Sequence, residues 1–312
     1  MHLATLFVNG HPAAAVQLSD GSFLEIAKAA SDRGEFTTAI HTGTLQAVIE
    51  TGDDALNGIR TLVAEAEDGR HTTATHTASN AILLAPIPVP RKNVFCVGRN
   101  YAEHIAEGER AQNKKIGVTE HPVYFTKPCT AVIGPLASIP VFQSLSESID
   151  YEVELTVVIG KAGRNITRER AFEHVFGYTI MNDITARDVQ RRHGGQYFKG
   201  KALDGSCPLG PCIVTADAIS DPQNLAIGLS VNGEQRQSGN TASMIFDIPN
   251  LIQSLSEGLT LEPGDLIATG TPSGVGYAMD PPHFLKHGDT VICEIAEIGR
   301  LENTLHNEIG TS

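Results

Sequence analysis

Short apolar runs separated by turn residues dominate the chain beyond residue 90. They predict strands at residues 94–97, 123–125, 152–159, 178–181, 213–214, 226–231, 265–268 and 290–295. Helical patterns are few, and the clearest covers residues 246–255, where the apolar positions fall on one face. Because the strands do not alternate regularly with helices, the pattern argues against a doubly wound sheet. It predicts a mixed α/β, mainly β fold with a β-roll or barrel-like core.

The first part of the chain has a different pattern. Residues 3–8 and 14–18 are predicted as strands that flank a turn at Asn9-Gly10. Apolar positions at helical spacing follow between residues 45 and 63. Pro86, Pro88 and Pro90 then hold the backbone extended and remove sheet donors. We therefore expect a small N-terminal α+β domain at residues 1–88 and a larger domain at residues 89–312.

Composition narrows the classes of function. The 312 residues are 41% hydrophobic and 19% charged, and no apolar run approaches the roughly 18 residues of a transmembrane helix. Acidic residues outnumber basic ones by 36 to 23, and the formal charge of −13 argues against nucleic-acid and membrane partners. The start of the chain lacks the pattern of a secretory signal, and the five cysteines show no close pairing. These features lead us to expect a cytoplasmic protein.

Two acidic stretches carry the most specific chemical signal. On a strand at residues 152–159, Glu152 and Glu154 point to one face, and such a pair requires solvent, a shared proton or a cation. Asp183 follows the apolar run 175–181 and lies at a predicted strand end. Together the three carboxylates would form an oxygen ligand set, which suits Mg²⁺ or Mn²⁺ better than Zn²⁺. The alternatives are a solvent-facing sheet edge for the glutamates and a helix N-cap for Asp183.

Basic and imidazole side chains are found in two further stretches. Lys201, within the aromatic and turn-rich residues 197–211, predicts a substrate clamp, an enolate stabiliser or a solvated surface ammonium. His104 and Glu107 are three residues apart, so on a helix the carboxylate would orient the imidazole as a general base. The alternative is an exposed helix start with an incidental histidine. The polar stretch 108–115 that follows suggests a mobile lid.

A glycine-rich loop at residues 268–276 follows a predicted strand. It lacks the Gly-Lys-Thr/Ser sequence of a phosphate-binding loop and the glycine spacing of a dinucleotide site. Ser273 also lacks the Gly-x-Ser-x-Gly frame of a nucleophile elbow. The backbone amides of this loop either bind an anionic oxygen or form a plain tight turn.

Taken in order, these stretches resemble the motifs of the fumarylacetoacetate hydrolase family. The resemblance spans about residues 93–305 and rests on Val-Gly-Arg-Asn-Tyr-Ala-Glu-His (97–104), Phe-Thr-Lys-Pro (125–128), Asp-Tyr-Glu-Val-Glu-Leu (150–155), Asn-Asp-Ile-Thr-Ala-Arg-Asp (182–188), Lys-Ala-Leu-Asp (201–204) and Thr-Gly-Thr-Pro-Ser-Gly-Val-Gly (269–276). It implies a mixed β roll and a homodimer. The lysine motif in the family more often reads Lys-Ser-Phe-Asp, so this chain keeps Lys201 and differs beside it.

The resemblance implies a role for ten residues. The implied metal ligands, for Mg²⁺ or Mn²⁺, are Glu152, Glu154 and Asp183, with Lys201 beside the metal. His104 and Glu107 are implied to form a water-activating pair on a lid that orders over bound substrate. The positions implied to contact a small 2-oxo acid are Arg99, Arg187, Gln190 and Thr271.

These residues fit hydrolysis of a carbon–carbon bond in a 2,4-dioxo acid, an acylpyruvate such as fumarylpyruvate, through a metal-stabilised enolate. His104 would draw a proton from water, and Lys201 would offset charge on the enolate. The same platform supports isomerase, decarboxylase or keto–enol tautomerase chemistry on a dicarboxylic 2-oxo acid, such as 2-hydroxyhepta-2,4-dienedioate or oxaloacetate. A non-catalytic cation-binding module is a further alternative, which the combination of His104, Glu107 and Lys201 disfavours. We expect hydrolysis first and isomerase or tautomerase chemistry second.

Overall fold

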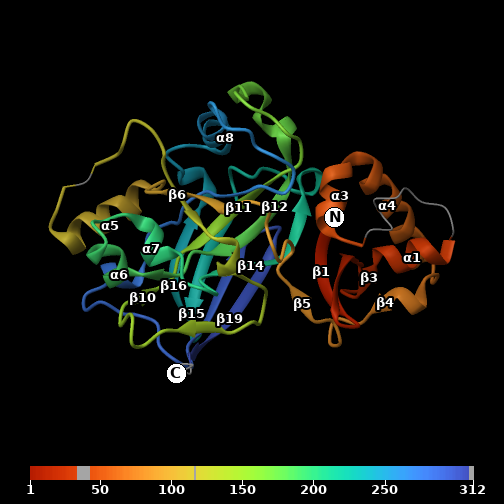
Figure 1. Cartoon of the computed structure of the whole chain (residues 1–312), viewed down its shortest axis with the longest axis horizontal. Coiled ribbons are helices and arrows are strands. Elements are labelled where there is room, and N and C mark those ends of the chain that lie inside the picture. Colours follow the sequence, from red (N-terminus) through yellow and green to blue (C-terminus); the bar gives the residue numbers. More distant parts are fainter. Residues whose placement is uncertain (34–42, 116, 309–312) are drawn as a thin grey trace.

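A twelve-stranded sheet runs through the middle of the molecule (Figure 1). The computed structural model describes residues 1–33, 43–115 and 117–308. The strand order in this sheet is β4-β3-β2-β1-β14-β12-β11-β17-β6-β7, with β5 paired to β1 and β8 paired to β14. Its strands are β1 (His2–Val8), β2 (His11–Gln17), β3 (Phe23–Glu25), β4 (Thr75–His76), β5 (Leu83–Leu84), β6 (Val94–Gly98), β7 (Val123–Lys127), β8 (Val132–Ile133), β11 (Val153–Ile159), β12 (Val175–Asn182), β14 (Cys207–Thr215) and β17 (Leu266–Ala268).

A five-stranded sheet packs against the centre of the large one. Its order is β16-β15-β18-β19-β9, and the strands are β9 (Ile139–Val141), β15 (Ala226–Val231), β16 (Glu234–Asn240), β18 (Thr290–Ile295) and β19 (Gly299–Asn307). Apolar side chains of β11 and β12 meet those of β15, β18 and β19 in one buried cluster. In a short antiparallel pair, β10 (Ile149–Asp150) precedes β11 in sequence and β13 (Thr185–Ala186) follows β12.

The helices form two groups on different sides of the molecule. Near the N-terminus, α1 (Ile26–Arg33), α3 (Leu45–Thr51) and α4 (Asp53–Glu67) cover the outer part of the large sheet and share a second buried cluster with it. At the opposite side of Figure 1 lie α5 (Ala102–Gln112), α6 (Arg187–Arg192) and α7 (Tyr197–Lys201), while α8 (Ile248–Ser256) packs at the top. None of the helices in the described ranges is long and apolar enough to cross a membrane.

The predicted fold class is confirmed. The chain is mixed α/β with more strand than helix, 34% against 28%. Each strand predicted beyond residue 90 is present, and the helix predicted at 246–255 is α8. The large sheet ends in two open edges, β4 and β7, so the core within the described residues is not a closed barrel.

The N-terminal segment shares the large sheet with the rest of the chain. β1 pairs antiparallel with β14, with His2 opposite Val214 and Leu3 opposite Ile213. The hairpin of β1 and β2 turns at Asn9-Gly10, as the sequence predicts, with both residues at positive φ. The division into domains at residues 88 and 89 stays a prediction, and main-chain hydrogen bonds of one sheet cross it.

Candidate active site

Three buried carboxylates meet where two central strands begin and end. Glu152 directly precedes β11, and Asp183 directly follows β12. The antiparallel register pairs Val153 with Asn182, which brings the two acids together, and the amide of Asp183 donates to the carbonyl oxygen of Glu152 at 2.8 Å. Ligand oxygens of Glu152, Glu154 and Asp183 all lie within 4.8 Å of one another. These three residues therefore form one acidic triad.

Neither structural alternative for these acids holds. β11 lies inside the sheet between β12 and β17, and Glu152 and Glu154 are only 5% and 1% exposed, so they do not form a solvent-facing edge. Helix α6 has Ala186 at its N-cap, which excludes Asp183 from that role. Buried carboxylates at this spacing repel one another and require positive charge nearby.

Lys201 supplies part of that charge from the end of α7. Its ammonium lies between two members of the triad and donates to Glu152 Oε2 at 2.8 Å and to Asp183 Oδ2 at 2.5 Å. A third hydrogen bond, at 2.8 Å, goes to Thr185 Oγ1. Burial favours the neutral amine of Lys201, but the charges of Asp183 and Glu152 outweigh it and raise its pKa above the usual value. The lysine is thus a fixed cation at the edge of the triad.

Arg187, the first residue of α6, holds the other side of Glu152. It donates to Glu152 Oε1 at 2.6 Å and to Asp150 Oδ2 at 2.8 Å, and its guanidinium lies 4.4 Å from the ring centroid of Tyr277. Burial acts to lower the pKa of Arg187, but Glu152 and Asp150 raise it above its ordinary value. Burial likewise acts to raise the pKa of Glu152, but Lys201 and Arg187 hold it well below the usual range.

Lys127, at the end of β7, is buried beneath the triad. Its ammonium donates to Asp183 Oδ1 at 2.8 Å, to the carbonyl oxygen of Ile184 at 3.0 Å and to the carbonyl oxygen of Lys201. Lys127 therefore links the carboxylate of Asp183 to the backbone of Lys201. The motif Phe-Thr-Lys-Pro contained this residue, but the sequence offered no reason to assign it a role.

The partners of Glu154 differ from those of the other two carboxylates of the triad. Its Oε2 accepts the amide of Gly270 at 2.9 Å, and within the described residues no basic side chain lies within ion-pair distance of it. Burial, together with the charges of Asp183 and Glu152, raises the pKa of Glu154 well above the usual value. A cation at this point would relieve the repulsion directly.

The donor set suits a hard divalent cation. Three buried carboxylates at close spacing supply only oxygen, which Mg²⁺ and Mn²⁺ prefer, and no nitrogen or sulfur donor belongs to the group. The triad is therefore able to hold a metal ion, with Lys201 and Arg187 fixing the orientation of Glu152.

His104 and Glu107 lie on α5, one turn apart. His104 Nδ1 is 2.8 Å from Glu107 Oε1, and because a carboxylate only accepts, Nδ1 carries the hydrogen and Nε2 is the ring nitrogen available for proton transfer. Glu107 Oε2 in turn accepts the amide of Gly274 at 2.8 Å. The pair is thus anchored to the glycine-rich loop, and residues 108–112 of the polar stretch continue the helix α5.

Buried contacts fix the start of α5 and the loop opposite it. The side-chain amide of Asn100 donates to the carbonyl oxygens of Phe246 and Thr269 at 2.9 and 2.8 Å. On the far side of the loop, Gln237 of β16 donates to Thr271 Oγ1 at 2.7 Å. Both contacts join segments that are distant in sequence, and neither amide was singled out from the sequence.

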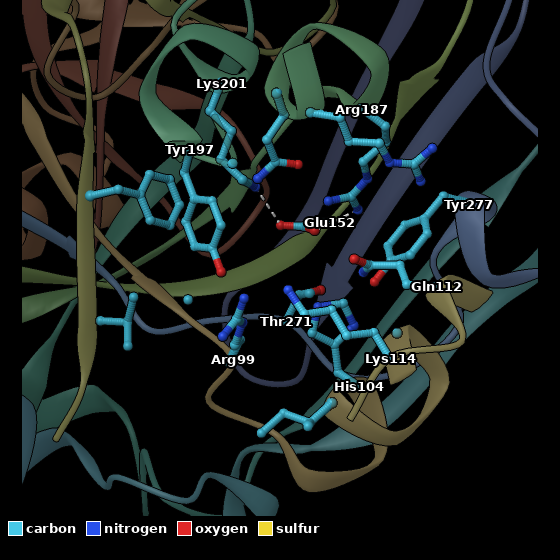
Figure 2. Close-up of a pocket in the computed structure, with 18 of the residues that line it drawn as sticks. Arg99, His104, Gln112, Lys114, Glu152, Arg187, Tyr197, Lys201, Thr271 and Tyr277 are labelled. Carbon is cyan, nitrogen blue, oxygen red and sulfur yellow. Dashed lines mark hydrogen bonds and ion pairs between the residues drawn. The ribbon is translucent and has the colours of Figure 1, made fainter. Parts of the chain in front are cut away.

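One cavity of about 360 Å³ connects these groups (Figure 2). Eight of the ten residues named from the sequence line it, namely Arg99, His104, Glu152, Glu154, Arg187, Gln190, Lys201 and Thr271. The other two, Glu107 and Asp183, lie behind it and bond to His104 and Lys201. The structure adds to the lining Gln112, Lys114, Arg191, Tyr197 and Tyr277.

The family follows from comparison with known proteins. A family model described as "Fumarylacetoacetate (FAA) hydrolase C-terminal" matches residues 93–306. The chain belongs to the fumarylacetoacetate hydrolase family. The matched segment contains all ten residues named from the sequence, and the family is one of enzymes.

Relatives within the family carry more than one activity in their names. "Oxaloacetate tautomerase YisK" of Bacillus subtilis (strain 168) is 43% identical over 295 residues, which are 94% of each chain. "Oxaloacetate tautomerase FAHD2A, mitochondrial" of Homo sapiens is 46% identical over 226 residues, covering 72% of this chain and 69% of that one. The solved structure of a fumarylacetoacetate hydrolase from psychrophilic Exiguobacterium antarcticum has a TM-score of 0.79, is 39% identical and covers 99% of this chain and 100% of its own.

Proposed function

We propose that this enzyme is a divalent-metal-dependent tautomerase that interconverts the keto and enol forms of oxaloacetate. The observation that carries the proposal is the 43% identity across 94% of both chains with a relative named for that reaction. From the sequence we expect hydrolysis first, but these relatives favour the second expectation, isomerase or tautomerase chemistry. The acidic triad and the His104–Glu107 pair in one cavity are compatible with either reaction.

The proposed metal is Mg²⁺ or Mn²⁺, held by Glu152, Glu154 and Asp183. When bound, such an ion would polarise the 2-oxo group and stabilise the negative charge of an enolate. His104 and Lys201 are proposed to carry out the proton transfer and the charge compensation.

His104 is the proposed proton carrier. In the keto form it removes a proton from carbon 3, the electron pair of that C–H bond forms the carbon–carbon double bond, and the 2-oxo oxygen takes up a proton to give the enol. Imidazole is the side chain most often used as a general base, and Glu107 holds the ring in one orientation. Lys201 already donates three hydrogen bonds as an ammonium, so it serves to offset negative charge on the enolate oxygen.

Two measurements test this reaction. With Mg²⁺ or Mn²⁺ present, the wild type should accelerate the decay of the ultraviolet absorbance of the enol and speed deuterium incorporation at carbon 3 of oxaloacetate without loss of carbon. His104→Ala should lose about 10²–10⁴-fold of this rate while still binding Mg²⁺ in calorimetry. A variant that keeps the wild-type rate would remove His104 from the mechanism, and no acceleration by the wild type would overturn the proposed function.

Hydrolysis of an acylpyruvate is the second candidate. It is favoured by the His104–Glu107 pair at 2.8 Å, because a carboxylate-oriented imidazole is suited to deprotonate water. In that reaction hydroxide attacks the distal carbonyl of a 2,4-dioxo acid, and the bond to the pyruvate unit breaks. Release of pyruvate from fumarylpyruvate, faster than tautomerisation of oxaloacetate, would decide for this candidate.

A further inference from the structure

Basic side chains around the cavity fall into two groups. Lys201 and Arg187 are paired with carboxylates of the acidic region, at 2.5–2.8 Å. Arg99, Lys114 and Arg191 also line the cavity, but within the described part of the chain none of their side chains pairs with a carboxylate. The two acids in the lining are Glu152 and Glu154, both in the triad. The cavity lining therefore combines acids of the triad with three basic side chains that do not belong to it.

The basic side chains in the cavity lining contrast with the net negative charge of the whole chain. Acidic residues outnumber basic ones by 36 to 23. Three cations in one cavity that pair with no carboxylate of the described residues therefore differ from the negative charge of the chain. The positive field of such a group attracts an anion to the cavity. Arg99 is half-buried, and Lys114 and Arg191 are exposed. Since the triad and its metal would take the 2-oxo acid end of a substrate, the three cations point to a second negative group at the other end.

Arg99 has an unusual backbone conformation and an aromatic neighbour. It has the left-handed φ of +60°, which is uncommon outside glycine and is found at functional sites where neighbouring contacts stabilise it. Its guanidinium lies 5.8 Å from the ring centroid of Tyr197. The same ring packs over Gly98, where an added Cβ would lie 2.8 Å from Tyr197 Cε2. The backbone beside Arg99 thus admits only glycine without movement of the ring.

Lys114 enters the cavity because α5 ends just before it. Asn113 takes a left-handed conformation with φ of +46°, and the amide of Lys114 donates to the carbonyl oxygen of Glu109 at 3.1 Å. The chain turns here, so Lys114 lines the cavity while its neighbour Lys115 does not. Figure 2 shows Lys114 on the α5 side, together with His104.

We propose that Arg99, Lys114 and Arg191 form a subsite for the distal carboxylate of a dicarboxylic 2-oxo acid, and that Lys114 is a specificity-determining residue. The inference rests on the proposed function for the position of the 2-oxo acid end. It extends that function by assigning Lys114 and Arg191 to substrate recognition, and it makes the second carboxylate the group that the enzyme selects.

The test compares two four-carbon ligands on the Mg²⁺-loaded protein. Oxaloacetate has a carboxylate where 2-oxobutyrate has a methyl group, and both share the 2-oxo acid end. Lys114→Met should weaken oxaloacetate binding about tenfold in calorimetry, the scale of one charge-assisted hydrogen bond, and leave 2-oxobutyrate within about twofold. Lys114→Arg should retain most of the selectivity. Lys115→Met is the matched control, because it removes the same charge from the adjacent residue, which is exposed like Lys114 but does not line the cavity.

Three results would overturn the subsite. Lys114→Met could weaken the binding of both ligands equally, or it could weaken the binding of neither. Lys115→Met could also weaken oxaloacetate binding as much as Lys114→Met does. Binding does not depend on turnover, so the outcomes separate the two proposals. If oxaloacetate binds with this selectivity but is not tautomerised, the proposed function fails and the subsite stands.

Discussion

Glu154 differs from the other two carboxylates of the triad in its partners. Glu152 is bonded by Lys201 and Arg187, and Asp183 by Lys127 and Lys201, whereas Glu154 accepts one backbone amide. In the absence of a cation, the charged form of Glu154 is therefore the least compensated of the three. A charged Glu154 would favour binding of a cation but destabilises the metal-free fold, so the two effects oppose each other at this residue.

Glu154→Gln is expected to separate these two effects. The amide keeps the shape and the acceptor for Gly270 but removes a charge that burial and two acids disfavour. Mg²⁺ affinity in calorimetry should fall at least about tenfold, while the urea midpoint of the metal-free variant should equal or exceed that of the wild type. Unchanged Mg²⁺ affinity would show that Glu154 is not a ligand.

Lys127 acts through its neighbours. Its ammonium holds Asp183 Oδ1 and two backbone carbonyls, and it does not line the cavity. Lys127→Met should weaken Mg²⁺ binding about 10–100-fold, as removal of an outer-shell partner does. It should also destabilise the protein, because Asp183 loses a buried hydrogen-bond partner.

Lys127→Arg is the conservative comparison for that variant. If Lys127 positions Asp183, the arginine should restore part of the Mg²⁺ affinity by keeping the charge and a donor. If Lys127→Met unfolds at a lower urea concentration but binds Mg²⁺ as tightly as the wild type, its role is structural only.

At the scale of elements, β16 shows why some functional contacts are hard to predict. Its sequence Glu-Gln-Arg-Gln-Ser-Gly-Asn has no apolar alternation, so the pattern did not predict a strand. It is a strand because Asn232 and Gly233, both at positive φ, turn the chain directly back along β15. The Asn-Gly pair was the available signal. Gln237, which orients Thr271, therefore came from the structure alone.

Helix α8 illustrates the opposite case. The sequence predicted its apolar face. Asp247 caps the helix by accepting a hydrogen bond from the amide of Asn250 at 3.0 Å. The guanidinium of Arg168 also donates a hydrogen bond to Asp247 Oδ1 at 2.6 Å. Burial acts to raise the pKa of Asp247, but Arg168 and the cap hydrogen bond hold it below the usual value.

Asp247→Ala should lower the free energy of unfolding by about 1 kcal/mol at pH 7, because it removes the cap. Asp247→Asn keeps a capping oxygen and should cost less. Since the folded pKa is depressed, the carboxylate stabilises above the unfolded pKa of about 3.9, and this contribution is lost as the pH falls through the folded value. Urea denaturation should thus show the difference between wild type and Asp247→Asn shrinking toward acid pH, and a difference that does not change with pH contradicts the assignment.

For the whole molecule, the triad links metal binding to stability. A cation that binds only the folded chain stabilises it by about 2.7 kcal/mol at a concentration one hundred times its Kd. Added Mg²⁺ should therefore raise the Tm of the wild type, and chelator should reverse the rise. Glu154→Gln serves as the control, since a tenfold weaker affinity reduces the stabilisation at the same concentration to about 1.4 kcal/mol, and its Tm should therefore rise less. An equal rise in both proteins would place the ion elsewhere.

In the folded chain the net charge of −13 is unevenly distributed. Part of it is concentrated in buried acids that require cations, while Arg99, Lys114 and Arg191 leave the rest of the cavity positive. An acidic protein is thereby able to attract an acidic substrate. The homodimer implied by the resemblance stays a prediction, which light scattering in solution tests directly.

Local patterns along the chain were sufficient for features that depend on sequence neighbours. Apolar runs predicted the central strands, helical spacing predicted α8, and motif order pointed to the family and implied ten site residues, whose roles stay predictions. The tertiary structure alone decided that Glu152 and Glu154 are buried, that Lys127 supports Asp183, and that Lys114 faces the cavity while Lys115 does not. These facts depend on strand register and on chain turns that join residues far apart in sequence, and no local pattern encodes which distant side chain will complete a buried charge.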